Sequence, residues 1–260
     1  AGHVAKPGRR AMTMLDVRNV TKQFGSLTAV SEVSMQVAPG ELRAIIGPNG
    51  AGKTTFFNMI SGFFAPTRGD IVFDGQVVTK LAVTERVTMG MARTFQITEI
   101  VPELTVRENI RIGVESAQGL RLRFWPGGSH TAAVNRGVDE ALAMSGLTAQ
   151  ADRLVGELSH GDQRAAEIAM ALTLKPRLLL LDEPTAGMGE HETYAVANLI
   201  RRLHKNSAYT IVLIEHDMRV VFNLADKITV LAEGKLLAEG TPAEIADNPV
   251  VQAAYLGKAE

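Results

Sequence analysis

The stretch Gly47-Pro48-Asn49-Gly50-Ala51-Gly52-Lys53-Thr54 matches the pattern G-x-x-x-x-G-K-[ST] in full. It follows an apolar run at residues 42–46 that predicts a strand, and residues 54–62 after it have a helical pattern. Its three glycines lack a Cβ, so the backbone can curl its N–H groups around phosphate oxygens. Lys53 would reach the β- and γ-phosphates, and Thr54 would offer its hydroxyl to Mg²⁺. The alternative is a glycine-rich turn that binds nothing, and the flanking strand and helix argue against it.

Two adjacent carboxylates, Asp182 and Glu183, follow four consecutive leucines at residues 178–181. Such a run predicts a strand buried on both faces, and ligands bind at the C-terminal tips of strands in parallel α/β sheets. Asp182 suits the coordination shell of Mg²⁺, and Glu183 can reach a water aligned with the γ-phosphate. The structural alternative is a pair of residues that caps the next helix.

Three further polar positions are candidates for the same site. His216 follows a second buried run at residues 211–214, which favours a functional role over a surface or structural one. Gln96 is a weaker signal because glutamine is commonly just a polar residue. Residues 158–163 lead into a helix, and Ser159 and Gly161 with free N–H groups form either an anion site or an ordinary cap.

The rest of the chain predicts a sheet covered by helices. Helical patterns at residues 162–174 and 191–205 alternate with the two buried runs, which indicates a parallel sheet with both faces covered. Alternating apolar residues predict antiparallel strands near the N-terminus, and Asp74-Gly75 predicts a tight hairpin. Residues 105–158 have a mostly helical pattern, interrupted by a predicted loop at residues 121–129. The antiparallel strands are expected at residues 15–20 and 30–37.

Composition excludes several classes of protein. The chain has 260 residues, of which 46% are hydrophobic and 21% charged, as in folded globular proteins. A formal net charge of −1 argues against a protein that mainly neutralises a nucleic-acid backbone. The absence of cysteine excludes disulfides and cysteine-ligated metals. The pure aliphatic runs are too short for a membrane span, and residues 1–12 are expected to be a flexible tail rather than a secretory signal.

Together these motifs resemble the ATP-binding subunits of ABC transporters, from about residue 14 to residue 256. The resemblance implies an α/β fold: a P-loop NTPase (RecA-like) core with a parallel sheet, an antiparallel β-subdomain and a helical subdomain. It implies one ATPase domain at residues 13–260, with the helical subdomain inserted at about residues 97–164. The implied cofactors are ATP and Mg²⁺.

The resemblance also assigns roles to residues. Phe24 corresponds to the aromatic residue that stacks on adenine, and Gln96 to the glutamine of the family's Q-loop. The expected catalytic residues are Glu183, His216 and Gln96, and the expected metal ligands are Thr54, Gln96 and Asp182. The residues expected to bind the nucleotide are Phe24, Gly47, Pro48, Asn49, Gly50, Ala51, Gly52, Lys53, Thr54, Thr55, Ser159 and Gly161.

Partners follow from the resemblance as well. Two identical or homologous subunits would form a head-to-tail dimer, with ATP held between the phosphate loop of one and Ser159 and Gly161 of the other. The dimer would work with transmembrane permease subunits and, indirectly, a solute-binding protein, at the cytoplasmic face of the inner membrane. No nucleic-acid partner is expected.

Within the family, residues 92–96, 214–218 and 240–257 are similar to the branched-chain or hydrophobic amino-acid uptake group, as is the insertion at residues 115–137. Two alternatives remain open: the same ATPase on a lipid or lipopolysaccharide exporter, and a soluble, non-transport ABC protein. Three positions depart from the family pattern, because His160 and Asp162 replace a glycine and a glutamine, and Gly189 stands where aspartate is common.

Overall fold

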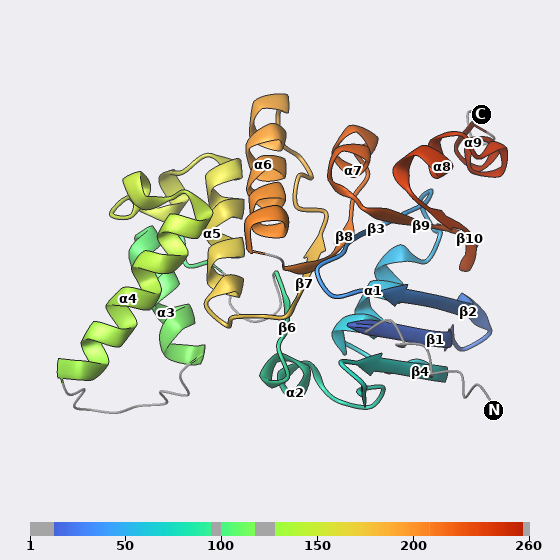
Figure 1. Cartoon of the computed structure of the whole chain (residues 1–260), viewed down its shortest axis with the longest axis horizontal. Coiled ribbons are helices and arrows are strands. Elements are labelled where there is room, and N and C mark those ends of the chain that lie inside the picture. Colours follow the sequence, from blue (N-terminus) through green and yellow to red (C-terminus); the bar gives the residue numbers. More distant parts are fainter. Residues whose placement is uncertain (1–12, 95–99, 118–127, 208, 257–260) are drawn as a thin grey trace, which may run out of the picture.

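The computed structural model describes residues 13–94, 100–117, 128–207 and 209–256 (Figure 1). The tail predicted at residues 1–12, Gln96 and most of the loop predicted at residues 121–129 lie outside these ranges. No helix within them is long and apolar enough to cross a bilayer.

A six-stranded sheet forms the centre of the molecule, in the order β10-β9-β3-β8-β7-β6. All neighbouring strands in it pair in parallel except β9 and β10, which pair antiparallel. The predicted parallel sheet is therefore confirmed, although the sequence patterns did not predict β6, β9 and β10. The bounds are β3 Leu42–Ile46, β6 Met91–Arg93, β7 Leu178–Asp182, β8 Thr210–Ile214, β9 Lys227–Ala232 and β10 Lys235–Gly240.

The four leucines of β7 show why this sheet needs cover on both faces. Leu178 and Leu180 belong to the core shared with α1 (Lys53–Ser61) and the antiparallel strands near the N-terminus. Leu179 and Leu181 belong to the core shared with helical residues such as Ile110, Ile168 and Leu199. All four are fully buried. Successive side chains of a strand point to opposite faces, so an uninterrupted apolar run stabilises both layers.

A second sheet, β2-β1-β4-β5, is antiparallel and lies at the opposite end of the molecule from α3 (Val106–Ala117) and α4 (Gly128–Ser145) (Figure 1). Leu15 pairs with Val37 in one hairpin, and Phe73 pairs with Gln76 across the turn at Asp74 and Gly75. Both predicted antiparallel features are confirmed. The bounds are β1 Leu15–Phe24, β2 Leu27–Val37, β4 Arg68–Phe73 and β5 Gln76–Val77.

The remaining regular secondary structure of the described residues is helical. In α6, the predicted apolar face of Val196, Leu199, Ile200 and Leu203 is buried, as expected from its spacing. The described parts of residues 105–158, which exclude residues 118–127, are largely helical, as predicted, and pack on α5. The bounds are α1 Lys53–Ser61, α2 Val83–Thr88, α3 Val106–Ala117, α4 Gly128–Ser145, α5 His160–Leu172, α6 Glu190–Ser207, α7 Met218–Leu224, α8 Pro242–Ala246 and α9 Pro249–Leu256, with 3₁₀ turns at Thr148–Gln150 and Val155–Glu157.

Arg86 of α2 fixes the C-terminal end of α1. Its side chain is buried, and Nη1 donates to the carbonyls of Met59 at 2.8 Å and Ile60 at 2.6 Å. The last carbonyls of a helix have no partner within the helix, so the guanidinium satisfies them. Nη2 and Nε donate to two further carbonyls, and burial lowers the pKa of Arg86 to about 10. Gly62 must be glycine here, since a Cβ would lie 2.7 Å from Arg86 Nε.

We expect Arg86→Met to lower the free energy of unfolding by about 3 kcal/mol, because buried carbonyls lose their donors. Urea unfolding followed by circular dichroism measures the change. Arg18→Met is the matched control: it removes an exposed ion pair with Asp16 and should cost less than about 1 kcal/mol. Equal losses in both variants would contradict this role.

Candidate active site

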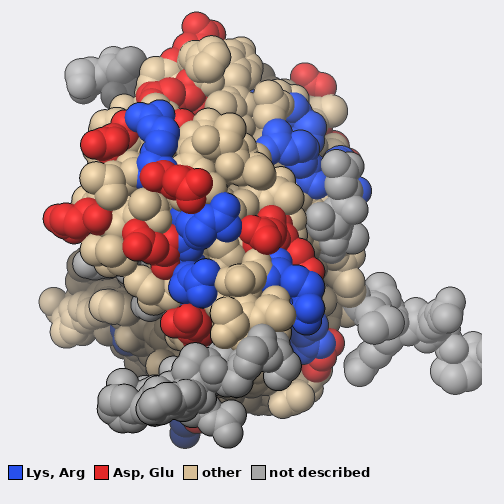
Figure 2. Space-filling model, turned by 90° about the vertical axis from the view of Figure 1, so that its left-hand side faces the viewer, with Lys and Arg blue, Asp and Glu red and all other residues tan. Residues whose placement is uncertain are grey.

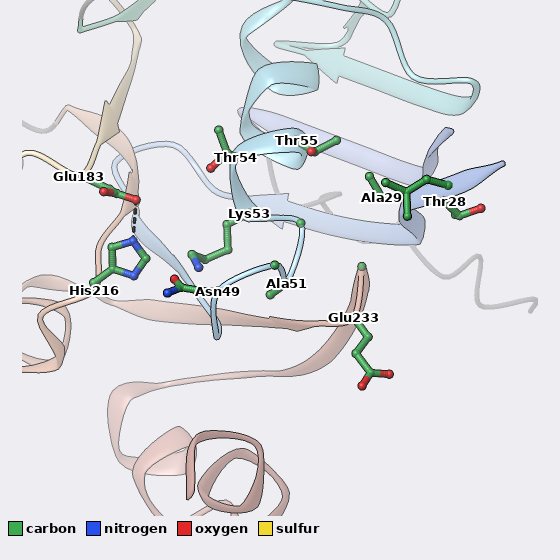
Figure 3. Close-up of a pocket in the computed structure, with 14 residues that line it drawn as sticks. Thr28, Ala29, Asn49, Ala51, Lys53, Thr54, Thr55, Glu183, His216 and Glu233 are labelled. Carbon is green, nitrogen blue, oxygen red and sulfur yellow. Dashed lines mark hydrogen bonds and ion pairs between the residues drawn. The ribbon is translucent and has the colours of Figure 1, made fainter. Parts of the chain in front are cut away.

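A cavity of about 470 Å³ opens where β3, β7 and β8 end (Figure 3). The loop after β3 forms one wall, the start of β2 and the β9–β10 turn form another, and Glu183 and His216 face them. The lining residues are Leu27, Thr28, Ala29, Asn49, Gly50, Ala51, Gly52, Lys53, Thr54, Thr55, Glu183, His216, Glu233 and Gly234. The fold thus brings most of the predicted loop together with the predicted catalytic pair.

The loop at residues 47–54 has the backbone geometry of a phosphate cradle. Gly50 and Gly52 have φ of 80° and 90°, in the left-handed region that side chains disfavour. A Cβ on Gly52 would also lie 2.5 Å from the carbonyl oxygen of Ala29. Gly52 is the N-cap of α1, and no described side chain caps that helix. The first N–H groups of α1 therefore remain available to an anion.

Lys53 points across its own loop. Its Nζ donates to the carbonyls of Gly47 at 2.8 Å and Pro48 at 3.1 Å. Burial lowers the pKa of Lys53, and the charge of Glu183 opposes that shift. The ammonium is thus fixed within the cradle, where a phosphate oxygen can take over from the two neutral carbonyls with a stronger, charge-assisted bond.

Glu183 and His216 form a hydrogen-bonded pair from two adjacent strands. Nε2 of His216 lies 2.6 Å from Oε1 of Glu183 (Figure 3), and both side chains remain partly exposed. Glu183 has φ of 44°, an uncommon conformation for a residue other than glycine. Its carboxylate is therefore oriented by His216 and open to the cavity, as a general base requires.

Glu215 joins the ends of β7 and β8 by hydrogen bonds, and no sequence motif predicted it. The side chain is 3% exposed, and Oε1 accepts hydrogen bonds from the N–H and hydroxyl of Thr185. Oε2 accepts the N–H of His216 at 2.8 Å. A buried carboxylate needs such hydrogen-bond donors. In the sequence, only the position of Glu215 beside His216 indicated a role for it.

The donors present fit magnesium held on phosphate groups. Asp182 supplies a carboxylate at the tip of β7, and Thr54 supplies a hydroxyl from the first turn of α1. The described chain contains no cluster of three histidine or carboxylate groups that could hold a metal by itself. Mg²⁺ binds through one or two carboxylates together with substrate phosphates and water, so the set is appropriate. Gln96, the other predicted ligand, lies outside the described residues.

Phe24 of β1 and Tyr255 of α9 are not among the residues that line the cavity. The ring of Phe24, 48% exposed, meets Phe64 edge-on with centroids 5.5 Å apart. Lys22 Nζ lies 5.2 Å from the centre of the Phe24 ring. From α9, Tyr255 accepts a hydrogen bond from the backbone of Gly47, and burial raises the pKa of this phenol to about 12. The C-terminal helix thus supports the base of the loop, a contact that no local pattern indicated.

Ser159 and Gly161 do not reach the cavity of their own chain. Ser159 Oγ caps α5 by accepting the N–H of Asp162 at 3.2 Å, and the N–H of Gly161 donates to Glu192 Oε1 at 3.3 Å. The other oxygen of Glu192 accepts the N–H of Gly189 at 3.4 Å. Of the three unusual positions, Gly189 therefore shares Glu192 with Gly161, and Asp162 takes part in the cap of α5.

Helix α5 also holds the segment that follows the adjacent carboxylates Asp182 and Glu183. Arg164 Nε donates to the carbonyl of Pro184 at 3.0 Å, and Nη1 pairs with Glu167 Oε2 at 2.6 Å. Burial raises the pKa of Glu167 to about 7, and the charge of Arg164 opposes this shift. The hydrogen bond from Arg164 to Pro184 thus anchors α5 to the segment after β7, and the ion pair with Glu167 holds the guanidinium in place.

Comparisons with known proteins agree with this geometry. Residues 30–186 match the family described as ABC transporter, and residues 235–260 match the one described as branched-chain amino acid ATP-binding cassette transporter. The high-affinity branched-chain amino acid transport ATP-binding protein LivG of Escherichia coli (strain K12) is 40% identical over 253 residues, covering 95% of this chain and 98% of that protein.

Two solved structures extend the comparison. A nucleotide-free ATP-binding cassette from an ABC transporter superposes with a TM-score of 0.82 at 30% identity, covering 95% of this chain and 100% of that one. A dimeric, post-hydrolysis cassette bound to ADP and Pi has a TM-score of 0.71 at 26% identity, with 88% and 99% covered.

We expect Lys53→Met to weaken ATP binding by about 1.5–3 kcal/mol, because a charge-assisted contact with phosphate is lost. Fluorescence titration with a labelled nucleotide measures the affinity. Lys227→Met removes the same charge from the exposed first residue of β9 and should leave affinity unchanged. Unaltered binding in Lys53→Met would remove this residue from the phosphate site.

Proposed function

The chain belongs to the ATP-binding subunits of ABC transporters, and we propose that this ATPase energises the uptake of branched-chain or other amino acids through partner membrane permeases. The 2.6 Å contact between Glu183 and His216, facing the phosphate loop across one cavity, carries the chemical part of this proposal. The similarity to LivG, together with the match of residues 235–260, supports the substrate class.

The residues divide the chemistry of hydrolysis between them. The loop N–H groups and Lys53 hold the phosphates, which places the γ-phosphorus within reach of a water activated by Glu183. His216 holds the Glu183 carboxylate in position through its Nε2. Thr54, Asp182 and Gln96 would hold Mg²⁺, which supplies positive charge at the phosphate oxygens when bound.

A second subunit would complete the site in head-to-tail fashion. Ser159 and Gly161 lie at the N-terminus of the 13-residue helix α5, where a partner's γ-phosphate would meet N–H groups and the positive end of the helix. They do not line the cavity of their own chain, and the bond from Gly161 to Glu192 is long enough to be exchanged. The related cassette that is dimeric with ADP and Pi supports this arrangement.

The domain organisation and cellular location follow from the same proposal. Residues 13–260 would form one ATPase domain, and the helical subdomain at about residues 97–164 would receive the permease at the cytoplasmic face of the inner membrane. Figure 2 shows this helical end of the molecule with basic and acidic side chains interspersed. Arg107, for example, pairs with Asp139 and Asp152. Mixed charge of this kind suits a protein partner better than nucleic acid.

We expect Glu183→Gln to keep ATP affinity, to lower turnover by about 10²–10⁴-fold and to accumulate an ATP-bound dimer, because the general base is lost while every phosphate contact remains. Phosphate release and light scattering measure these effects. Glu190→Gln, an exposed neighbour on α6, is the control and should behave as the unchanged protein. Turnover retained in Glu183→Gln would exclude it as the base.

The substrate class is tested with the complete transporter. The chain is reconstituted in vesicles with its partner permease and solute-binding subunits, and ATP hydrolysis is measured with leucine, with a lipid extract and with RNA. We expect several-fold stimulation by leucine through the binding subunit. Stimulation by lipid alone would indicate export instead of uptake, and stimulation by RNA alone would indicate a non-transport ABC protein.

A further inference from the structure

We propose that Arg93 is a positioning residue for the metal site: it orients the carboxylate of Asp182 and supplies its counter-charge. This inference rests on the role proposed above for Asp182 as a ligand of Mg²⁺. It concerns a residue that lies on β6, 89 positions before its partner in the sequence, and to which the stretch at residues 92–96 assigned no role.

The contact between Arg93 and Asp182 is short and shielded from water. Nη2 of Arg93 lies 2.6 Å from Oδ2 of Asp182, and the two side chains are only 10% and 20% exposed. Hydrogen bonds between two charged groups are the strong ones, and a carboxylate has about four lone-pair sites on its two oxygens. One oxygen of Asp182 is therefore held by Arg93, while lone pairs remain for a metal or its water.

Arg93 is itself held by the helix that begins at the phosphate loop. Its Nη1 donates to Asn58 Oδ1 at 2.7 Å and to Ser61 Oγ at 3.0 Å, both on α1. The guanidinium carbon also lies 4.9 Å from the centre of the Phe57 ring. A planar guanidinium can make these contacts together, whereas a lysine ammonium cannot reproduce the fork or the stacking. Arg93 thus links α1, which carries Lys53 and Thr54, to the acidic tip of β7.

The charge of Arg93 matters because a triphosphate would bring more negative charge toward Asp182. Arg164 is also electrostatically coupled to Asp182, but its guanidinium is engaged by Pro184 and Glu167. With Arg93 present, part of the repulsion between Asp182 and phosphate is already offset without metal. Without it, nucleotide binding should depend more heavily on Mg²⁺. The factor by which Mg²⁺ strengthens nucleotide binding therefore reports the role of Arg93.

The experiment measures binding of a fluorescent ADP analogue to the full chain, in EDTA and in saturating Mg²⁺. We expect Arg93→Met to raise the ratio of the dissociation constant in EDTA to that in Mg²⁺ by at least about fivefold. Arg93→Lys should raise this ratio less. Each ratio compares one preparation with itself, so partial loss of folded protein cancels. Arg93→Lys keeps the test available if Arg93→Met does not fold.

Arg177→Met is the matched control. Arg177 has the same chemistry away from the cavity, since it pairs with Asp74 at 2.6 Å and lies 5.4 Å from the centre of the Phe73 ring. The ratio of the two dissociation constants in Arg177→Met should equal that of the unchanged protein. A rise in Arg177→Met as large as that in Arg93→Met would make the effect nonspecific and overturn the proposal.

Asp182→Asn separates this inference from the function on which it rests. If Asp182→Asn abolishes the effect of Mg²⁺ while Arg93→Met leaves the ratio unchanged, the metal site stands and the role of Arg93 is wrong. If Asp182→Asn leaves the effect of Mg²⁺ intact, Asp182 is not a metal ligand and the underlying proposal fails first.

Discussion

The parallel hydrogen-bonded register of β7 and β8 is the constraint on which the site depends. It places Asp182 opposite Ile214, and the N–H of Glu183 then donates to the carbonyl of Ile214 at 3.0 Å. His216 follows two residues later, which brings its ring onto the Glu183 carboxylate. A shift of one residue in this pairing would move Asp182 and Glu183 relative to Ile214 and His216, so the alignment of the two strands also sets the geometry of the site.

Charged side chains are concentrated where β3, β7 and β8 end, and most of them have a hydrogen-bonding or charged partner within the fold. Glu215 has the donors of Thr185 and His216, Asp182 has Arg93, and Lys53 has two loop carbonyls. Charges removed from water destabilise a protein unless they are paired or hydrogen-bonded, so this network allows the site to exist before it binds a ligand. Helix α1, supported at its far end by Arg86, connects the cradle to the rest of the core.

Sequence alone predicted the parts of this site that depend on local signals. The glycine pattern, the leucine run before Asp182 and the helical face of α6 are properties of neighbouring residues, and the fold has them where they were expected. Arg93, Glu192 and Tyr255 were not predicted, because their contacts join segments far apart in the chain. Strands β6, β9 and β10 were not predicted either, and the roles assigned to the site residues, Phe24, Gln96, Ser159 and Gly161 among them, stay predictions.

The central claim is that one chain holds half of the site and that a second copy completes it. Because the chain contains no cysteine, single thiols can be introduced by Asn49→Cys in one tagged copy and His160→Cys in another, both in the Glu183→Gln background. A short bifunctional thiol reagent is added with and without ATP. The account predicts a cross-link between the two different copies that requires ATP. Cross-linking that ignores ATP, or that joins two copies carrying the same substitution, would contradict it.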